Sequence, residues 1–126
     1  METLRIEPTD DSPKIMLDPK TGRGEISGKS LPEDVVAFYQ PVIDWIRAYA
    51  PEAPPQSEIV FRLVYFNTAS SKQLLDVMIA LEKLAEAGKK VLIKWYSIED
   101  DEEMQEAGHE YAEMVSIPFE HYTYIP

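Results

Sequence analysis

A group of residues that can accept a covalent modification or bind an ion lies between two apolar segments of the chain. Its members are Asn67, Thr68, Ser70, Ser71 and Lys72, within the stretch "YFNTASSKQLLD". A strand-like apolar run ends at this group, and an apolar pattern with helical spacing resumes at Leu74. The start of a helix has free backbone N–H groups and the positive end of a dipole, and both attract an anion. The spacing therefore fits a hydroxyl that accepts a phosphate.

Helix capping explains the same hydroxyls in a simpler way. Ser and Thr are strong capping residues, so in this interpretation Ser70 or Ser71 caps the helix and Thr68 is a loop residue. A phosphate on Thr68 would instead add about −1.5 to −2 charges and three acceptor oxygens. A negative charge at a helix start is stabilising by roughly 0.3–1 kcal/mol, so the fold tolerates the modification while the surface changes sharply. The residues alone leave both interpretations open.

A cluster of carboxylates and a histidine near the C-terminus has the spacing of di-iron ligands. Its members are Glu106, His109, Glu110 and Glu113. A di-iron centre needs a second such motif and further carboxylates on facing helices, and the sequence has neither. We interpret the cluster as the solvated acidic face of a helix and expect no metal.

Signatures of catalysis are missing from the sequence. Nucleophilic hydrolysis needs a Ser, Thr or Cys within reach of a His and an acid. The chain has two histidines, no cysteine and no Gly-x-Ser-x-Gly turn. The stretch "TGRGEISG" lacks the Lys-Ser/Thr pair of a phosphate-binding loop. We expect no catalytic residue and no cofactor.

The pattern of apolar residues predicts the elements that position the junction. We expect strands at Leu4–Pro8, Lys14–Asp18, Glu25–Gly28, Glu58–Asn67, Lys89–Ser97 and Ser116–Ile125, and helices at Val35–Ala50, Ser71–Ala87 and Glu99–Val115. Strands that alternate with helices predict an α/β fold, a mixed β-sheet with helices packed on it. A length of 126 residues is enough for one domain, residues 1–126, with a sizeable core.

Local features refine this prediction. Ser30 and Glu33 have the spacing of a capping box before the first helix, and Pro41 predicts a kink or a break within it. The apolar strand at Glu58–Asn67 is typical of a central strand that is covered on both faces. Several aromatic residues belong either to the core or to a docking surface: Phe38, Tyr39, Trp45, Tyr49, Trp95 and Tyr96.

The charge of the chain excludes one class of partner. Twelve Lys and Arg stand against 23 Asp and Glu, which gives a formal net charge of −11. Nucleic-acid binding needs a basic face, and anionic membrane surfaces are disfavoured by the same charge. No apolar run is long enough to insert into a bilayer. Without cysteine or a visible secretory leader, we expect a cytoplasmic protein.

Four segments resemble the SiaC family of bacterial regulatory phosphoproteins, small acidic domains that are similar to STAS-type anti-sigma-factor antagonists. The segments are "LDPKTGRGEISGKSLPED", "FYQPVIDW", "YFNTASSKQLLD" and "VLIKWYSIEDDEEMQEAGHEYAE". They span most of the chain in the expected order. The resemblance implies a single STAS-like regulatory domain, residues 1–126, whose phosphoacceptor threonine is Thr68.

The resemblance also implies a non-enzymatic partner switch. A serine/threonine kinase phosphorylates Thr68, and a PPM-type serine/threonine phosphatase removes the phosphate. The unphosphorylated form binds and activates a diguanylate cyclase, which raises cyclic di-GMP and favours biofilm formation. The residues expected to meet the partner are Asn67, Thr68, Ser70, Ser71 and Lys72. The alternative is a small-molecule-binding module or a minor enzyme that holds the phosphate or carboxylate of a ligand in the loop 67–72.

Overall fold

The computed structural model describes residues 1–126 as one sheet with three α-helices. The strands are β1 (Leu4–Ile6), β2 (Lys14–Asp18), β3 (Arg23–Ser30), β4 (Gln56–Phe66), β5 (Lys90–Ile98) and β6 (Phe119–Tyr124). The helices are α1 (Val35–Tyr49), α2 (Thr68–Glu86) and α3 (Glu102–Met114), with a 3-10 turn, η1, at Ala50–Glu52. The six strands lie in chain order, antiparallel from β1 to β3 and parallel from β3 to β6. The predicted single-domain α/β fold with a mixed sheet is confirmed.

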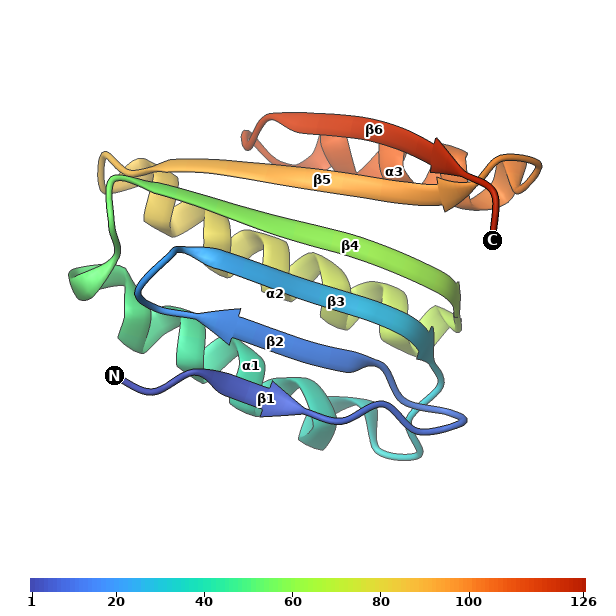
Figure 1. Cartoon of the computed structure of the whole chain (residues 1–126), viewed down its shortest axis with the longest axis horizontal. Helices are drawn as coiled ribbons and strands as arrows, with labels where there is room; N and C mark the ends of the chain where they lie inside the picture. Colours follow the sequence, from blue (N-terminus) through green and yellow to red (C-terminus); the bar gives the residue numbers. More distant parts are fainter.

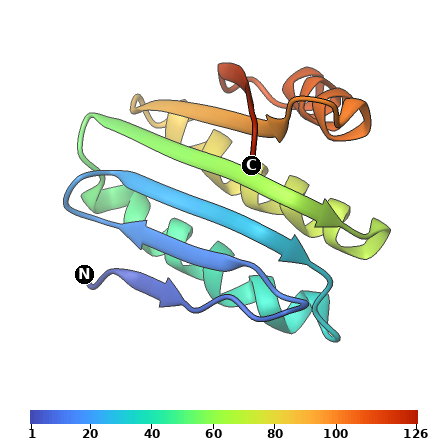
Figure 2. The same ribbon diagram turned by 45° about the vertical axis from the view of Figure 1, so that its right-hand side comes forward.

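All three α-helices cover the same face of the sheet (Figures 1 and 2). Each helix connects two neighbouring parallel strands, and the sheet grows in one direction from β3 to β6. Because such connections are right-handed, connections that advance in the same direction place their helices on the same side. None of the helices has the length and apolar character that crossing a bilayer requires.

The opposite face of the sheet is open, which corrects the prediction for β4. Phe61 and Leu63 are buried under the helices, whereas Arg62 and Val64 are exposed on the open face. On that face, the guanidinium carbon of Arg62 lies 4.6 Å from the ring centroid of Tyr96. The prediction that both faces of β4 are covered is wrong. It arose because apolar residues such as Val64 also occupy outward positions of the strand. Hydropathy alone therefore hides the alternation.

Helix α1 has a different cap from the one that the sequence predicts. Its N-cap is Asp34, whose carboxylate oxygen accepts a hydrogen bond from the N–H of Ala37 at 3.1 Å. Ser30 is the last residue of β3, where it pairs with Phe66 of β4 and is fully buried. The predicted capping box of Ser30 is therefore wrong. Asp is as strong a capping residue as Ser, and the strand pairing holds Ser30 in extended backbone.

Pro41 does not break α1, which runs without interruption from Val35 to Tyr49. A proline within a helix leaves the carbonyl four residues earlier without its backbone donor, here the carbonyl of Ala37. Both residues are exposed, so water can hydrate that carbonyl. Of the predicted kink or break, the break is therefore wrong, because the proline lies on the solvent side of the helix.

The core between sheet and helices is built around Trp95 of β5, which is 1% exposed. Its indole N–H donates to the carbonyl of Met104 in α3 at 2.9 Å. The rings of Phe61 and Tyr111 pack beside it, with centroids 5.8 and 5.6 Å away. Gly108 lets α3 approach this ring, because a Cβ on residue 108 would overlap the indole.

The aromatic residues that the sequence left open divide into three groups. Tyr39, Tyr49 and Trp95 are buried in the core, Phe38 and Trp45 are partly buried, and Tyr96 lies on the open face of the sheet.

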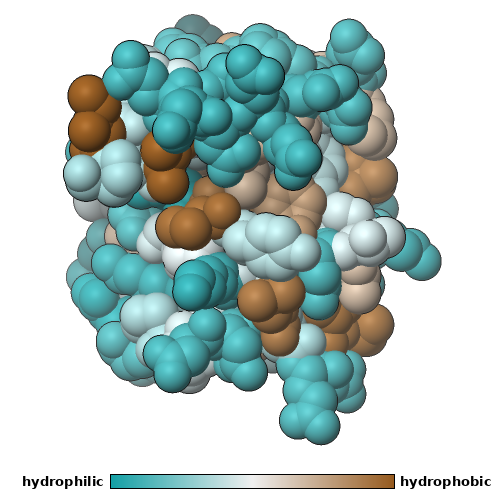
Figure 3. Space-filling model, turned by 90° about the vertical axis from the view of Figure 1, so that its right-hand side faces the viewer, coloured by the Kyte–Doolittle hydropathy of each residue, from teal (hydrophilic) through white to brown (hydrophobic).

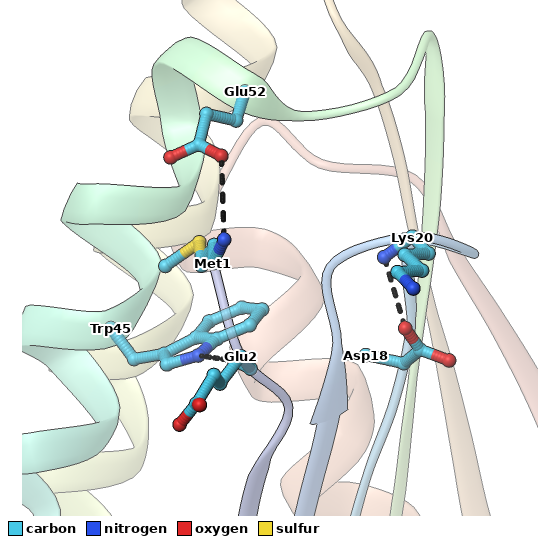
Figure 4. Close-up of polar contacts among 6 residues, drawn as sticks. All are labelled: Met1, Glu2, Asp18, Lys20, Trp45 and Glu52. Atoms are coloured by element: carbon cyan, nitrogen blue, oxygen red, sulfur yellow. Dashed lines mark hydrogen bonds and ion pairs between the residues drawn. The ribbon is translucent and has the colours of Figure 1, made fainter.

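The N-terminus is tied to α1 and to η1 (Figure 4). The indole N–H of Trp45 donates to the carbonyl of Glu2 at 3.0 Å, and the terminal ammonium of Met1 lies 3.9 Å from a carboxylate oxygen of Glu52. In the turn after β2, the N–H of Lys20 donates to Asp18 at 2.9 Å, which lowers the pKa of that carboxyl. The contacts of Met1 and Glu2 fix the chain directly before the edge strand β1.

Candidate functional site

The junction before α2 lies at the edge of the sheet where the parallel strands β3, β4 and β5 end. This edge is on the right in Figure 1, where the α-helices also begin, and it faces the viewer in Figure 3. Hydrophobic residues gather near the middle of this face, between two hydrophilic regions. The carboxyl ends of strands in open α/β sheets are common places for ligands.

Asn67 caps helix α2, and Thr68 is the first residue of the helix. The side-chain oxygen of Asn67 accepts a hydrogen bond from the N–H of Ser70 at 2.8 Å. Its backbone carbonyl accepts one from the N–H of Ser71 at 3.0 Å. The interpretation in which Ser70 or Ser71 caps the helix is therefore wrong, because the amide of Asn67 already performs that role.

Thr68 is exposed to solvent at the start of α2. Its own N–H and that of Ala69 find no acceptor in the protein, because the first N–H groups of a helix have no carbonyl one turn earlier. A phosphate on Thr68 would lie beside these donors and the positive end of the helix dipole. The geometry is thus open to a modifying enzyme and favourable to an anion.

Ser70 is fully buried and belongs to a chain of hydroxyl groups beneath Thr68. The hydroxyl of Ser70 donates to the carbonyl of Ser30 at 2.9 Å, and the hydroxyl of Ser30 donates to Oγ of Ser70 at 2.9 Å. The hydroxyl of Tyr39 completes the chain at 2.6 Å from Oγ of Ser30, and burial raises the pKa of Tyr39 to about 12. This network ties α2 to β3 and α1. Because Ser70 does not reach the surface, it is removed from the set of predicted partner contacts.

Ser71 and Lys72 lie one turn into α2. The hydroxyl of Ser71 donates to the carbonyl of Thr68 at 2.7 Å, and its carbonyl accepts a hydrogen bond from the hydroxyl of Tyr111 at 2.8 Å. Burial raises the pKa of that Tyr111 hydroxyl. Lys72 is exposed, and the three ion pairs of the structure all join other residues. The ammonium of Lys72 is therefore available to an anion.

A β-bulge directly before the junction leaves two neighbouring apolar side chains, Val64 and Tyr65, pointing outward. The pairing of β3 with β4 shifts between Gly28 and Lys29, so that one residue of β4, Val64, is left without a partner. Val64 and Tyr65 are 42% and 53% exposed. Strict alternation would have turned Tyr65 inward with Leu63. Neither residue is among the predicted site residues. The one sequence feature at the shift in register is Gly28 of β3, whose φ is 104°.

The hollows near the junction are shallow grooves between helices. One groove beside α2 faces α1 and has a volume of about 290 Å³, and the other faces α3 and has about 280 Å³. Small-molecule pockets usually measure roughly 300–1,000 Å³. The geometry therefore gives no particular support to a small-molecule-binding module or a minor enzyme.

The acidic cluster of α3 lies on an exposed helix face, as predicted. Glu106, His109, Glu110 and Glu113 are all exposed. No group of three or more potential ligands in the chain is arranged to hold a metal ion. The ring of His109 instead stacks on that of His121 in β6, with centroids 4.0 Å apart. Burial, together with the neighbouring His109, lowers the pKa of His121.

The sequence matches one protein family over nearly its whole length. Residues 6–124 match the model described as "SiaC family regulatory phosphoprotein". A curated relative, an uncharacterized protein of Pseudomonas aeruginosa (strain UCBPP-PA14), is 32% identical over 119 residues, which is 94% of each chain.

Solved structures of Pseudomonas aeruginosa proteins are similar to this fold. Apo-SiaC is 31% identical with a TM-score of 0.87, over 97% of this chain and 99% of that one. SiaC is also known in complex with the diguanylate cyclase SiaD, of which it is the activator. That structure is 30% identical with a TM-score of 0.89, over 96% of this chain and 99% of the other.

Proposed function

The chain belongs to the SiaC family of regulatory phosphoproteins, and we propose that it is a partner switch controlled by phosphorylation of Thr68. In its unphosphorylated form it binds and activates a diguanylate cyclase, as SiaC of Pseudomonas aeruginosa does with SiaD. The observation that carries this proposal is an exposed threonine at the first position of a capped helix, beside two unpaired N–H groups.

Two further enzymes set the state of the switch. A serine/threonine kinase esterifies the hydroxyl of Thr68, and a PPM-type serine/threonine phosphatase hydrolyses the ester. The chain itself acts by binding, without a cofactor, in the cytoplasm. Its output is cyclic di-GMP, which favours biofilm formation. The proposed partner contacts are Asn67, Thr68, Ser71 and Lys72.

Electrostatics and desolvation give the switch its direction. A phosphate adds about −1.5 to −2 charges at pH 7 to a chain whose formal net charge is already −11. If Thr68 is covered by the cyclase, the phosphate loses its water and repels acidic groups of the partner. The exposed position of Thr68 supports a change in binding without a change in fold.

The test compares tagged variants that are purified from the cells in which the chain occurs. We expect wild type and Thr68→Ala to carry a diguanylate cyclase with them, detected as conversion of GTP to cyclic di-GMP in the eluate. Thr68→Asp places a charge at the phosphate position and should carry far less. Thr3→Asp makes the same charge change at an exposed residue before β1 and serves as the matched control.

Two results would contradict the proposal. One is the absence of any diguanylate cyclase in the wild-type and Thr68→Ala eluates. The other is equal cyclase activity with Thr68→Asp and Thr3→Asp. Intact mass of the native protein, with the modified peptide mapped, separately establishes whether Thr68 carries a phosphate.

A further inference from the structure

The two grooves beside α2 differ in chemistry. The groove between α2 and α3, here called the α2/α3 groove, has an apolar floor made of Phe66, Leu75, Ala107, Tyr111 and Met114. Met114 is 56% exposed, so its apolar side chain is open to a partner. The groove on the α1 side is lined instead by several charged residues, among them Arg47, Asp76 and Lys83.

Thr68 stands on the side of α2 that borders the α2/α3 groove. Residues four and seven positions apart share one side of a helix, so Thr68 lies in line with Lys72 and Leu75, which both line the groove. Ser71, another lining residue, is hydrogen-bonded to Thr68 on one side and to Tyr111 of α3 on the other. The groove is therefore continuous with the phosphorylation site that we propose.

The two edges of the groove carry opposite charges. Lys72 lies on the α2 edge and Glu110 on the α3 edge, and neither takes part in an ion pair of the structure. A partner with a negative group on one side and a positive group on the other can therefore bind this groove in one preferred orientation.

We propose that the α2/α3 groove receives an amphipathic helix of the diguanylate cyclase. The apolar stripe of this helix lies on the groove floor, an acidic residue faces Lys72, and a basic residue faces Glu110. Amphipathic helices bind apolar grooves in this way through anchors spaced three and four residues apart. The inference rests on the proposed function and names the surface and the kind of segment that carry it out.

The charge on the α2 edge explains how one phosphate acts on this complex. Lys72 alone gives that edge one positive charge, and a phosphate one turn earlier adds about −1.5 to −2. The sum is negative, so the edge that attracted the acidic side of the partner helix repels it. The phosphorylated residue also lies four positions before Lys72, which is the favourable order for an ion pair within a helix. The Lys72 ammonium then pairs with the phosphate and is no longer available to the partner.

The experiment measures the dissociation constant between recombinant, unmodified variants and the cyclase that co-purifies with the wild-type chain. Lys72→Glu tests the charged edge, and Met114→Glu tests the apolar floor. Lys83→Glu and Val36→Glu are matched controls that make the same changes in the groove on the α1 side. Val36 is 55% exposed, almost the same as Met114. Thermal melting confirms that each variant is folded.

We expect Lys72→Glu and Met114→Glu to weaken binding about tenfold or more, and Lys72→Arg to retain it. The control variants should remain within about twofold, because single surface substitutions outside an interface change little. Glu110→Lys should also weaken binding, because it reverses the charge of the α3 edge.

Three outcomes would overturn the proposal. If Lys72→Glu and Met114→Glu bind like wild type while Thr68→Asp does not, the groove is not the contact and the phosphorylation switch still stands. If the α1-side variants lose binding instead, the partner uses the other groove. If Met114→Glu changes the oligomeric state of the free chain in light scattering and leaves cyclase binding unchanged, the groove joins two copies of this chain.

Discussion

Replacing Ser70 with alanine tests whether the buried hydroxyl network holds the start of α2. The hydroxyl of Ser70 donates to the carbonyl of Ser30 and accepts from the hydroxyl of Ser30. In Ser70→Ala the carbonyl keeps one donor, the N–H of Asn67 at 3.3 Å. The buried hydroxyls of Ser30 and Tyr39, however, then share a single hydrogen bond, so one of their two protons is left without an acceptor. A buried donor without a partner costs about 1–3 kcal/mol.

Tyr39→Phe cuts the same network at its other end and should cost less. The hydroxyl of Tyr39 is bonded to Ser30, but without it Ser30 still donates to Ser70. No buried donor is left unpaired, so the loss is that of one hydrogen bond, about 0.5–1.5 kcal/mol. Ser71→Ala removes a bond on a partly exposed side chain and should stay within about 0.5 kcal/mol.

Urea denaturation of the three variants measures these free energies of unfolding. The expected order of destabilisation is Ser70→Ala, then Tyr39→Phe, then Ser71→Ala. Hydrogen exchange should also speed up at the first amides of α2 in Ser70→Ala. If Ser70→Ala is no less stable than Ser71→Ala, the network does not stabilise the fold and this reasoning fails.

The remaining predictions concern other contacts of the fold. Gly108→Ala should destabilise the chain by about 1–3 kcal/mol or more, because the new Cβ overlaps the buried ring of Trp95; an unchanged urea midpoint would refute this packing. Asn67→Ala should cost about 0.5–2 kcal/mol by removing the cap of α2, and wild-type stability of this variant would show that the cap is dispensable. His121 has a lowered pKa in the folded chain, so the unfolded chain binds its proton more readily. Stability should therefore fall as the pH drops below the ordinary value of 6.5, and His121→Gln should weaken this dependence.

The order of strands and helices was predictable because each element carries its own apolar period. Strands β2 and β5 and helices α2 and α3 begin and end close to the predicted residues. The errors arose where the sequence offers two solutions of similar energy. Ser30 and Asp34 are both good caps, and the pairing of β3 with β4 decides between them. The apolar run of β4 conceals its alternation because Val64 and Tyr65 point outward.

The position of the site was predictable, but its three-dimensional surroundings were not. Asn67 and Thr68 lie at the strand-to-helix junction, as the pattern indicates. Two features that shape the surface depend on residues 40 positions away. These are the bond from Ser70 to Ser30, which buries Ser70, and the bond from Tyr111 to Ser71, which joins α3 to the site. Local spacing carries no information about such contacts, so the groove beside Thr68 becomes visible only in the fold.

The most direct test of the account compares the phosphorylated and the unmodified chain as activators of the same cyclase. The cyclase that co-purifies with wild type is titrated with each form, and the rate of cyclic di-GMP formation is measured. We predict that the unmodified chain raises this rate to a plateau, that the chain phosphorylated on Thr68 leaves it near the basal value, and that phosphatase treatment restores activation. Equal activation by both forms would contradict the central claim.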